Sequence, residues 1–332
     1  MRVYECEKYV CTRETVSEML ERYGVAVIPS VLSDAECQEM LDGMWAYLAE
    51  VSSTFETPID RDKPETWREM RKLFPKHSML LQHFSIGQAE MNWKLRQNPK
   101  LVDIFSTIWD TPNEELLVSF DGASFHFPPE LVRYGWFKGS GAEVGWLHCD
   151  QALKGKDVGK RTCIQSWVTA NHVEEGDATL VFLEGSHAHH AAFAEQLGDG
   201  ASTDDWYKLT EEDMRWYTNE KGCARVHVKC PAGSLVLWDS RTIHSGTEPE
   251  RARKKAKLRC VSYLCYTPRR WATPSIIRKR VKAFQEGRTT THWPHRPKLF
   301  PKTPRTYGAP VPNVGAISQP LMSALGRRLV GF

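Results

Sequence analysis

The chain has 332 residues, of which 41% are apolar and 26% are charged. This length allows one large domain or two small ones, and the absence of any run of about 18 apolar residues argues against a membrane span. Nine cysteines without a C-x-x-C pair argue against a disulfide framework. Since the sequence also carries no secretory or peroxisomal signal, we expect a cytoplasmic protein.

The net charge of +3 is unevenly distributed along the chain. Residues 1–250 carry 25 Lys/Arg and 40 Asp/Glu, whereas residues 251–332 carry 19 Lys/Arg and a single acid, Glu286. Such a basic segment can bind an anionic substrate, a nucleic acid or an acidic surface. The simpler alternative is a solvated charged face that docks on the acidic body of the same chain.

The first third of the chain, residues 1–115, is predicted to be a helical support with one early strand at 25–29. The sequence Ser33-Asp34-Ala35-Glu36 has the form of a capping box. Apolar residues then recur every three or four positions as far as Leu48, which is typical of an amphipathic helix. Two more helices are expected around 64–74 and 86–108.

From about residue 116 the pattern changes to short strand-like segments separated by Gly, Pro and Asp. Eight such strands over 116–267 indicate a sandwich or barrel. They are expected near 116–127, 144–150, 161–169, 178–183, 224–229, 234–239, 242–246 and 259–267. The composition of residues 188–222 predicts an insert that forms a partly helical lid. A basic, Pro-rich extension covers 268–332, with a helix at 275–286, and the whole of 1–332 is predicted to be a single domain.

The clearest chemical signal is His148-Cys149-Asp150 on an expected strand. Residues two apart on a strand point to the same face, so an imidazole and a carboxylate lie side by side, and Cys149 points into the core. One more imidazole would complete a two-His-one-carboxylate triad, which leaves coordination positions open on an octahedral iron. Those positions can accept a bidentate cosubstrate and O₂.

His244 is the candidate for the third ligand. It follows an apolar strand and a polar turn, and it lies 94 residues after Asp150, which leaves room for the strands that would bring the two together. An isolated histidine is more often a hydrogen-bonded structural residue. Together with His148 and Asp150, however, the ligand interpretation is favoured.

Arg259 begins the next expected strand. A guanidinium at this point can clamp a carboxylate bidentately. If 2-oxoglutarate chelates iron through its 1-carboxylate and 2-keto oxygen, its far carboxylate needs such a partner. Arg251 and Arg253 are alternatives, because six basic residues crowd positions 251–259.

In this order the segments resemble the phytanoyl-CoA dioxygenase family of Fe(II)/2-oxoglutarate oxygenases over about residues 20–267. Two departures stand out: one extra residue separates Trp146 from His148, and Glu184 stands where the family pattern usually has Pro. The resemblance rests on Tyr23–Pro29, the helix opening at Ser33, Trp146–Asp150, Gln165–Ala170, Leu180–His187, and the segments at His244 and Arg259.

The resemblance implies a mainly β fold with flanking helices around a double-stranded β-helix (jelly-roll, cupin-like) core. It also implies Fe(II) held by His148, Asp150 and His244, with 2-oxoglutarate bound by Arg259 and Trp167 lining its pocket. The stretch from His244 to Arg259 is longer than is usual in the family. Because Asp150 keeps the carboxylate that related halogenases replace, hydroxylation or another oxidation is favoured over halogenation.

The predicted function is a non-haem Fe(II)- and 2-oxoglutarate-dependent dioxygenase. It would use O₂ to oxidise a C–H bond of a small organic substrate, with release of succinate and CO₂. Two alternatives stay open. One is a catalytically silent jelly-roll module whose basic C-terminal segment binds a polyanion such as nucleic acid. The other is a zinc hydrolase that uses the same three ligands.

Trp146 and Phe125 are candidate substrate contacts, although buried packing is the commoner role for such residues. The basic residues after position 250 suggest an anionic substrate, such as a coenzyme A ester, a phosphate ester or a nucleotide. Lys254, Lys255 and Lys257 would then contact it. No membrane partner is expected.

Overall fold

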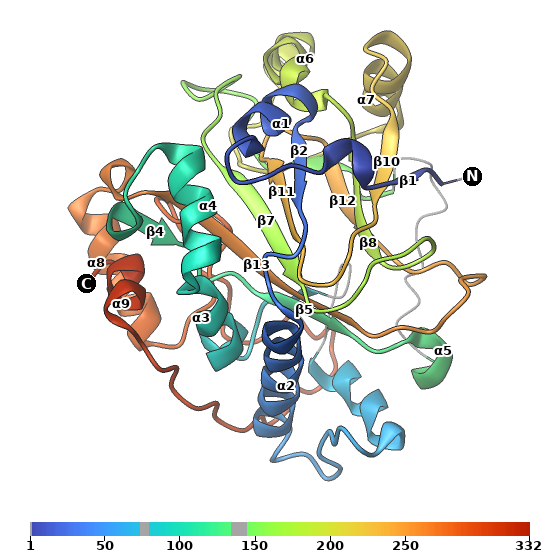
Figure 1. The fold of residues 1–332 in the computed structure, drawn as a ribbon, viewed down its shortest axis with the longest axis vertical. Coiled ribbons are helices and arrows are strands. Elements are labelled where there is room, and N and C mark those ends of the chain that lie inside the picture. Colours follow the sequence, from blue (N-terminus) through green and yellow to red (C-terminus); the bar gives the residue numbers. More distant parts are fainter. Residues whose placement is uncertain (1, 74–79, 134–144) are drawn as a thin grey trace.

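Two β-sheets form the centre of the protein in a computed structural model that describes residues 2–73, 80–133 and 145–332 (Figure 1). The first sheet has the strand order β2-β11-β7-β13-β5-β3, with β4 joined to β13, and the second has the order β1-β10-β8-β12-β6-β9. The strands are β1 (Tyr4–Glu5), β2 (Val25–Ile28), β3 (Leu80–Leu81), β4 (Leu116–Val118), β5 (Ala123–His126), β6 (His148–Cys149), β7 (Ile164–Thr169), β8 (Thr179–Leu183), β9 (Tyr207–Lys208), β10 (Arg225–Val228), β11 (Leu235–Asp239), β12 (His244–Thr247) and β13 (Arg259–Pro268).

Eight of these strands make up the jelly-roll, namely β5, β6, β7, β8, β10, β11, β12 and β13. Along the chain they alternate between the two sheets, apart from β8 and β10, which pair with each other. Strands that are distant in sequence therefore become neighbours. Thus β13 lies between β5 and β7, and β12 lies between β6 and β8. This topology confirms the predicted mainly β fold with a double-stranded β-helix core.

Helices α2, α3 and α4 pack against β13 on one face of the first sheet (Figure 1). The predicted capping box is confirmed: Ser33 caps α2, and its side chain and that of Glu36 exchange hydrogen bonds with each other's backbone amides. The helices are α1 (Val16–Tyr23), α2 (Asp34–Val51), α3 (Glu90–Arg96), α4 (Pro99–Trp109), α5 (Pro129–Val132), α6 (His190–Leu197), α7 (Glu211–Arg215), α8 (Pro274–Gln285) and α9 (Ala324–Val330).

Three sequence-based boundaries differ from the structure. The single helix expected at 86–108 is divided into α3 and α4, because Pro99 lacks an amide hydrogen and begins a new helix that Asn98 caps. The segment expected as a helix at 64–74 is a run of 3₁₀ turns over Pro64–Leu73, and residue 74 lies outside the described residues. The single strand expected at 116–127 is divided into β4 and β5, which pair with different parts of β13.

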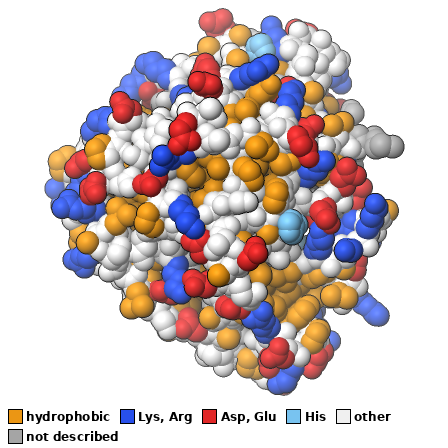
Figure 2. Space-filling view, in the orientation of Figure 1, with side chains coloured by type: hydrophobic (Ala, Val, Ile, Leu, Met, Phe, Trp, Pro, Cys, Tyr) orange, Lys and Arg blue, Asp and Glu red, His pale blue; other side chains and the backbone are white. Residues whose placement is uncertain are grey.

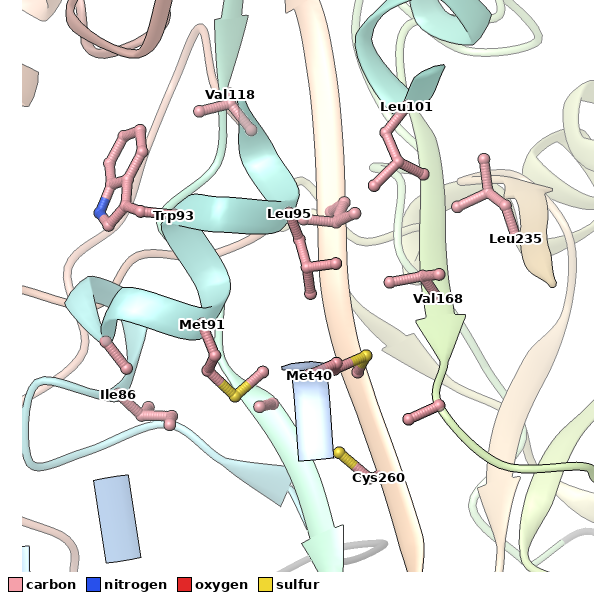
Figure 3. Close-up of a cluster of buried hydrophobic side chains, with 14 of the residues drawn as sticks. Met40, Ile86, Met91, Trp93, Leu95, Leu101, Val118, Val168, Leu235 and Cys260 are labelled. Carbon is pink, nitrogen blue, oxygen red and sulfur yellow. The ribbon is translucent and has the colours of Figure 1, made fainter. Parts of the chain in front are cut away.

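The main hydrophobic core lies between these helices and the first sheet, and its side chains follow the period-2 alternation of the strands. On β11, Leu235 and Leu237 belong to this core, whereas Val236 and Trp238 belong to a second cluster with residues of the other sheet. The helices contribute Met40, Met91, Leu95 and Leu101, which face Val168, Leu235 and Cys260 of the sheet (Figure 3).

The C-terminal part of the chain folds back on the body of the protein. Arg280, on the predicted basic helix, is fully buried and donates hydrogen bonds to the backbone carbonyls of Val118, Pro294, Leu329 and Val330. These bonds tie α8 to β4 and α9. On the face drawn in Figure 2, the basic and acidic side chains of the described residues are interspersed rather than gathered by sign. No helix in the described ranges is both long and apolar enough to span a bilayer.

Candidate metal centre and active-site cavity

His148 and His244 lie directly opposite each other on two paired strands. His148 begins β6 and His244 begins β12, and the antiparallel register pairs these two residues. Because directly opposed side chains on one face of a sheet are neighbours, the two imidazole centroids lie 4.5 Å apart. Two segments about one hundred residues apart thus present their side chains at one point.

Asp150 completes the cluster, two residues beyond His148. Its Oδ1 lies 3.7 Å from His148 Nε2, and its Oδ2 lies 3.4 Å from His244 Nε2. One potential ligand atom from each of the three residues lies within 4.8 Å of the others, and this is the one such cluster found among the residues that the structure describes. Atoms at this spacing suit ligands around a single metal ion, each about 2.0–2.2 Å from it.

Backbone carbonyls fix the tautomer of both histidines. His148 Nδ1 lies 2.7 Å from the Trp146 carbonyl, and His244 Nδ1 lies 2.8 Å from the Thr242 carbonyl. A carbonyl only accepts hydrogen bonds, so Nδ1 must carry the proton in both rings. The lone pair of each Nε2 is therefore available. Metal-bound histidines commonly donate their other ring N–H to a backbone carbonyl in the same way.

Burial and neighbouring charges set the protonation of the cluster. Burial alone would favour a neutral Asp150 carboxyl, but the neighbouring His148, His292 and His244 together outweigh it and hold the pKa of Asp150 well below its usual range. Burial lowers the pKa of His244. The pKa of His148 is raised, because the Asp150 carboxylate outweighs burial. An ionised carboxylate and a neutral imidazole are the metal-binding forms, so a metal ion competes with a proton mainly at His148.

Gln165 orients the carboxylate from the neighbouring sheet. Its Nε2 donates a hydrogen bond of 3.1 Å to Asp150 Oδ2. Gln165 lies on β7, on the same face as Trp167, and this face lines the cavity described below. Cys149 points the other way, as expected, and is fully buried in a separate hydrophobic cluster. The strand alternation therefore separates His148 and Asp150 from the core at this position.

A cavity of about 660 Å³ opens beside the three residues, within the range of about 300–1,000 Å³ that is typical of small-molecule sites. Both sheets, the insert and the C-terminal segment contribute side chains to it. The described lining residues include His148, Asp150, His244, Gln165, Trp167, Arg259, Tyr263, Asp121, Trp146, Trp206, Trp238, His292, Trp293, Lys298 and Phe300.

Arg259 and Trp167 both lie on the cavity, and neither Arg251 nor Arg253 does. The Arg259 guanidinium stands over the Trp167 ring at 5.6 Å, donates from Nη1 to the Ala178 carbonyl and approaches Ser124 Oγ through Nε. Tyr263, which also lines the cavity, interacts with the same guanidinium. Arg253, by contrast, is held by Glu130 and Asp177.

Two further expectations have different outcomes. Trp146 lines the cavity, with Lys208 Nζ 4.6 Å above its ring. Phe125 does not line it. Ser124 faces Arg259, so the next side chain on β5 points to the opposite side, where Phe125 packs fully buried against Trp45 and Phe127. Phe125 is therefore a core residue and not a substrate contact.

The lysines expected to contact an anionic substrate lie elsewhere. Lys254, Lys255 and Lys257 are not among the described residues that line the cavity. Lys257 instead pairs with Glu174 and lies 3.5 Å from Asp177. The basic run thus follows the outside of the jelly-roll between β12 and β13.

Several cavity residues were not anticipated from the sequence. Gln165 lay inside a recognised strand, and only its period-2 relation to Trp167 could have placed it on the same face. The lining residues of the insert and of the C-terminal segment carry no local signal, because tertiary docking brings them to the cavity. These residues are Asp204, Asp205 and Trp206 of the insert and Thr291, His292, Trp293, Lys298 and Phe300 of the C-terminal segment. Asp121, in the connection between β4 and β5, was not anticipated either.

The sequence model of the phytanoyl-CoA dioxygenase family matches residues 20–253. Among curated proteins, the chain is 27% identical over 282 residues to Ava biosynthesis cluster protein O of Aspergillus versicolor, which covers 83% of this chain and 84% of that protein. It is also 29% identical over 123 residues to a putative phytanoyl-CoA dioxygenase of Dictyostelium discoideum, which covers 36% of this chain and 33% of that protein.

A solved structure supports the fold. GlcNAc Inducible Gene 2 of Candida albicans aligns with a TM-score of 0.51 and 14% identity, and the alignment covers 82% of this chain and 67% of that one. At this level of identity the likeness concerns the fold alone. It agrees with the jelly-roll topology of the two sheets.

Proposed function

Because the chain belongs to the phytanoyl-CoA dioxygenase family, we propose that it is a non-haem Fe(II)- and 2-oxoglutarate-dependent dioxygenase whose iron is held by His148, Asp150 and His244. The observation that carries this proposal is the pair of available Nε2 atoms beside an ionised carboxylate, all within 4.8 Å of one another. Two imidazoles and one carboxylate are the ligand set of iron(II) oxygenases, and they leave further coordination positions open.

The cosubstrate is proposed to bind between the metal centre and Arg259. This guanidinium can pair with a carboxylate, and Trp167 and Tyr263 line the cavity together with it. When bound, Fe(II) and 2-oxoglutarate supply the oxidising chemistry, in which O₂ oxidises a substrate C–H bond while 2-oxoglutarate is decarboxylated to succinate and CO₂. The protein holds the ligands, orients the cosubstrate and excludes water from the cavity.

Each proposed residue has a defined task. The Trp146 and Thr242 carbonyls hold the two imidazoles so that each Nε2 faces the metal position. Gln165 holds one carboxylate oxygen of Asp150. The buried aromatic walls reduce access of bulk water. The substrate is proposed to be a small organic molecule that occupies the remaining volume.

The function is tested by following conversion of 2-oxoglutarate to succinate by the purified protein with added Fe(II) and O₂. We expect turnover in the wild type, even without the organic substrate, and loss of turnover in His244→Ala. Absence of turnover under all conditions would contradict the proposal and favour the catalytically silent module. Anaerobic Fe(II) protein should also gain a chelate absorption band on addition of 2-oxoglutarate. Failure to do so would favour the zinc hydrolase.

A further inference from the structure

The C-terminal segment Thr291–Phe300 forms one wall of the cavity, although it lies outside residues 20–253, which match the family model. It is a hairpin-like loop. The Thr291 amide donates to the Lys298 carbonyl, and the Lys298 amide donates to Thr291 Oγ1. The preceding Thr290 amide donates to the Phe120 carbonyl. These hydrogen bonds hold the segment in place beside the connection between β4 and β5, so its side chains have defined positions in the wall of the cavity.

Ion pairs join this segment to the loop 204–206 of the insert, across the cavity rim. Lys298 Nζ lies 3.5 Å from Asp204 Oδ1, and Arg296 Nη2 lies 3.2 Å from Asp205 Oδ1. Arg296 also stands 3.7 Å above the Trp293 ring. The two segments therefore form a single rim in which basic and acidic groups neutralise each other.

Aromatic side chains dominate the substrate side of the cavity. Trp206 is the clearest case: it lines the cavity, its ring centroid lies 6.3 Å from that of His148, and 48% of its surface is exposed. Trp146, Trp293 and Phe300 line the cavity with it. A half-exposed tryptophan beside a metal centre offers a flat face on which an aromatic ring can stack.

Among the described lining residues, no basic side chain remains to bind an acidic group of a substrate. Arg259 is assigned to 2-oxoglutarate and Asp150 to the metal, and Lys298 is paired with Asp204. The charged lining side chains are four acids and two bases: Asp121, Asp150, Asp204 and Asp205, with Arg259 and Lys298. Asp204 and Asp205 are matched by Lys298 and Arg296, so a carboxylate or phosphate on the substrate would be desolvated without an unpaired base among the described lining residues, which is unfavourable.

Resting on the proposed function, we infer that the substrate of this cavity carries a flat aromatic ring system and no acidic group. The ring stacks on Trp206, and the C-terminal segment Thr291–Phe300 contributes Phe300 to the same recognition site. This assignment reverses the expectation of an anionic substrate, because the basic residues that suggested one lie outside the cavity or are already paired.

Binding of three probes to anaerobic protein loaded with Fe(II) and 2-oxoglutarate tests the inference by calorimetry. The probes are 2-(1-naphthyl)ethanol, its saturated decalin analogue, and 1-naphthylacetate. We expect the naphthyl alcohol to bind at least about fivefold more tightly than the saturated alcohol and the anion. Trp206→Ala and Phe300→Ala should each weaken its binding about two- to tenfold, the range expected for one aromatic contact.

Two matched variants serve as controls. Trp271→Ala removes a tryptophan that is 37% exposed, and Phe332→Ala removes a phenylalanine that is 41% exposed, both outside the described lining of the cavity. Both should bind the naphthyl alcohol like the wild type. Equal or tighter binding of the anion, no binding of the naphthyl alcohol, or unchanged binding in Trp206→Ala and Phe300→Ala would each overturn the inference.

The chelate absorption band, recorded on the same samples, distinguishes a failure of the substrate inference from a failure of the proposed function. A wild type that shows the band but fails the probe tests overturns only the substrate inference. A wild type without the band overturns the proposed function, and the substrate inference falls with it.

Discussion

Gln165→Leu removes the hydrogen bond that holds Asp150 while keeping a side chain of similar size. In the structure Gln165 Nε2 lies 3.1 Å from Asp150 Oδ2, and this same oxygen lies 3.4 Å from His244 Nε2. Without the amide the carboxylate loses its buried donor and can rotate away from the metal position. Loss of such an outer-shell partner typically weakens metal binding about 10- to 100-fold, or by about 1.4–2.7 kcal/mol.

The assay is an anaerobic competition titration of Fe(II) between the protein and a chelator of known affinity. Gln38→Leu is the matched control, because Gln38 donates a similar bond of 2.8 Å to Asp42 on the exposed face of α2. We expect the control to bind Fe(II) like the wild type. A Gln165→Leu protein that is folded by circular dichroism and binds Fe(II) within about twofold of the wild type would refute the reasoning.

Three further predictions follow from other buried groups. Arg259→Leu should weaken 2-oxoglutarate binding by at least about tenfold, as expected for the loss of a charge-assisted hydrogen bond. Arg253→Leu should leave the affinity for 2-oxoglutarate unchanged. Equal losses of affinity in the two variants, measured by calorimetry, would contradict the assignment of Arg259 to the cosubstrate. Burial raises the pKa of Asp121 to about 6 from an ordinary 3.8, so its stabilising contribution is present at low pH and is lost as the pH rises through 6. In urea unfolding, the free energy of unfolding of the wild type should therefore fall by about 1 kcal/mol between pH 5 and 7.5 relative to that of Asp121→Asn. A difference between the two proteins that does not change with pH would argue against this. Arg280→Met should lower the free energy of unfolding by about 3–5 kcal/mol, since four carbonyls lose their donor; a loss below about 1 kcal/mol would contradict that role.

The sequence predicted that His148, Asp150 and His244 come together because its signals are local. The period of a strand places His148 and Asp150 on one face whatever surrounds them. The apolar strand and polar turn before His244 defined where the third ligand begins a new strand. What could not be predicted from these segments was the exact register, in which His244 faces His148 directly.

The substrate side was not predictable in the same way, because it is built by tertiary docking. Trp206 lies in the irregular stretch of the insert between α6 and β9, and the segment that contains Trp293 and Phe300 is recognisable from the sequence only as basic and Pro-rich. The position of this tail depends on buried contacts of Arg280 with backbone carbonyls of distant segments, and backbone carbonyls carry no sequence signal. A count of basic residues therefore could not show which of them reach the cavity: Arg259 and Lys298 line it, whereas Lys254, Lys255 and Lys257 are not among its described lining residues.

The most direct test of the central claim is a crystal structure of the anaerobic Fe(II) protein with anomalous diffraction measured at the iron edge. We expect one anomalous peak within bonding distance of His148 Nε2, His244 Nε2 and an oxygen of Asp150. A peak at another position, or an imidazole of His244 turned away from the metal, would contradict it.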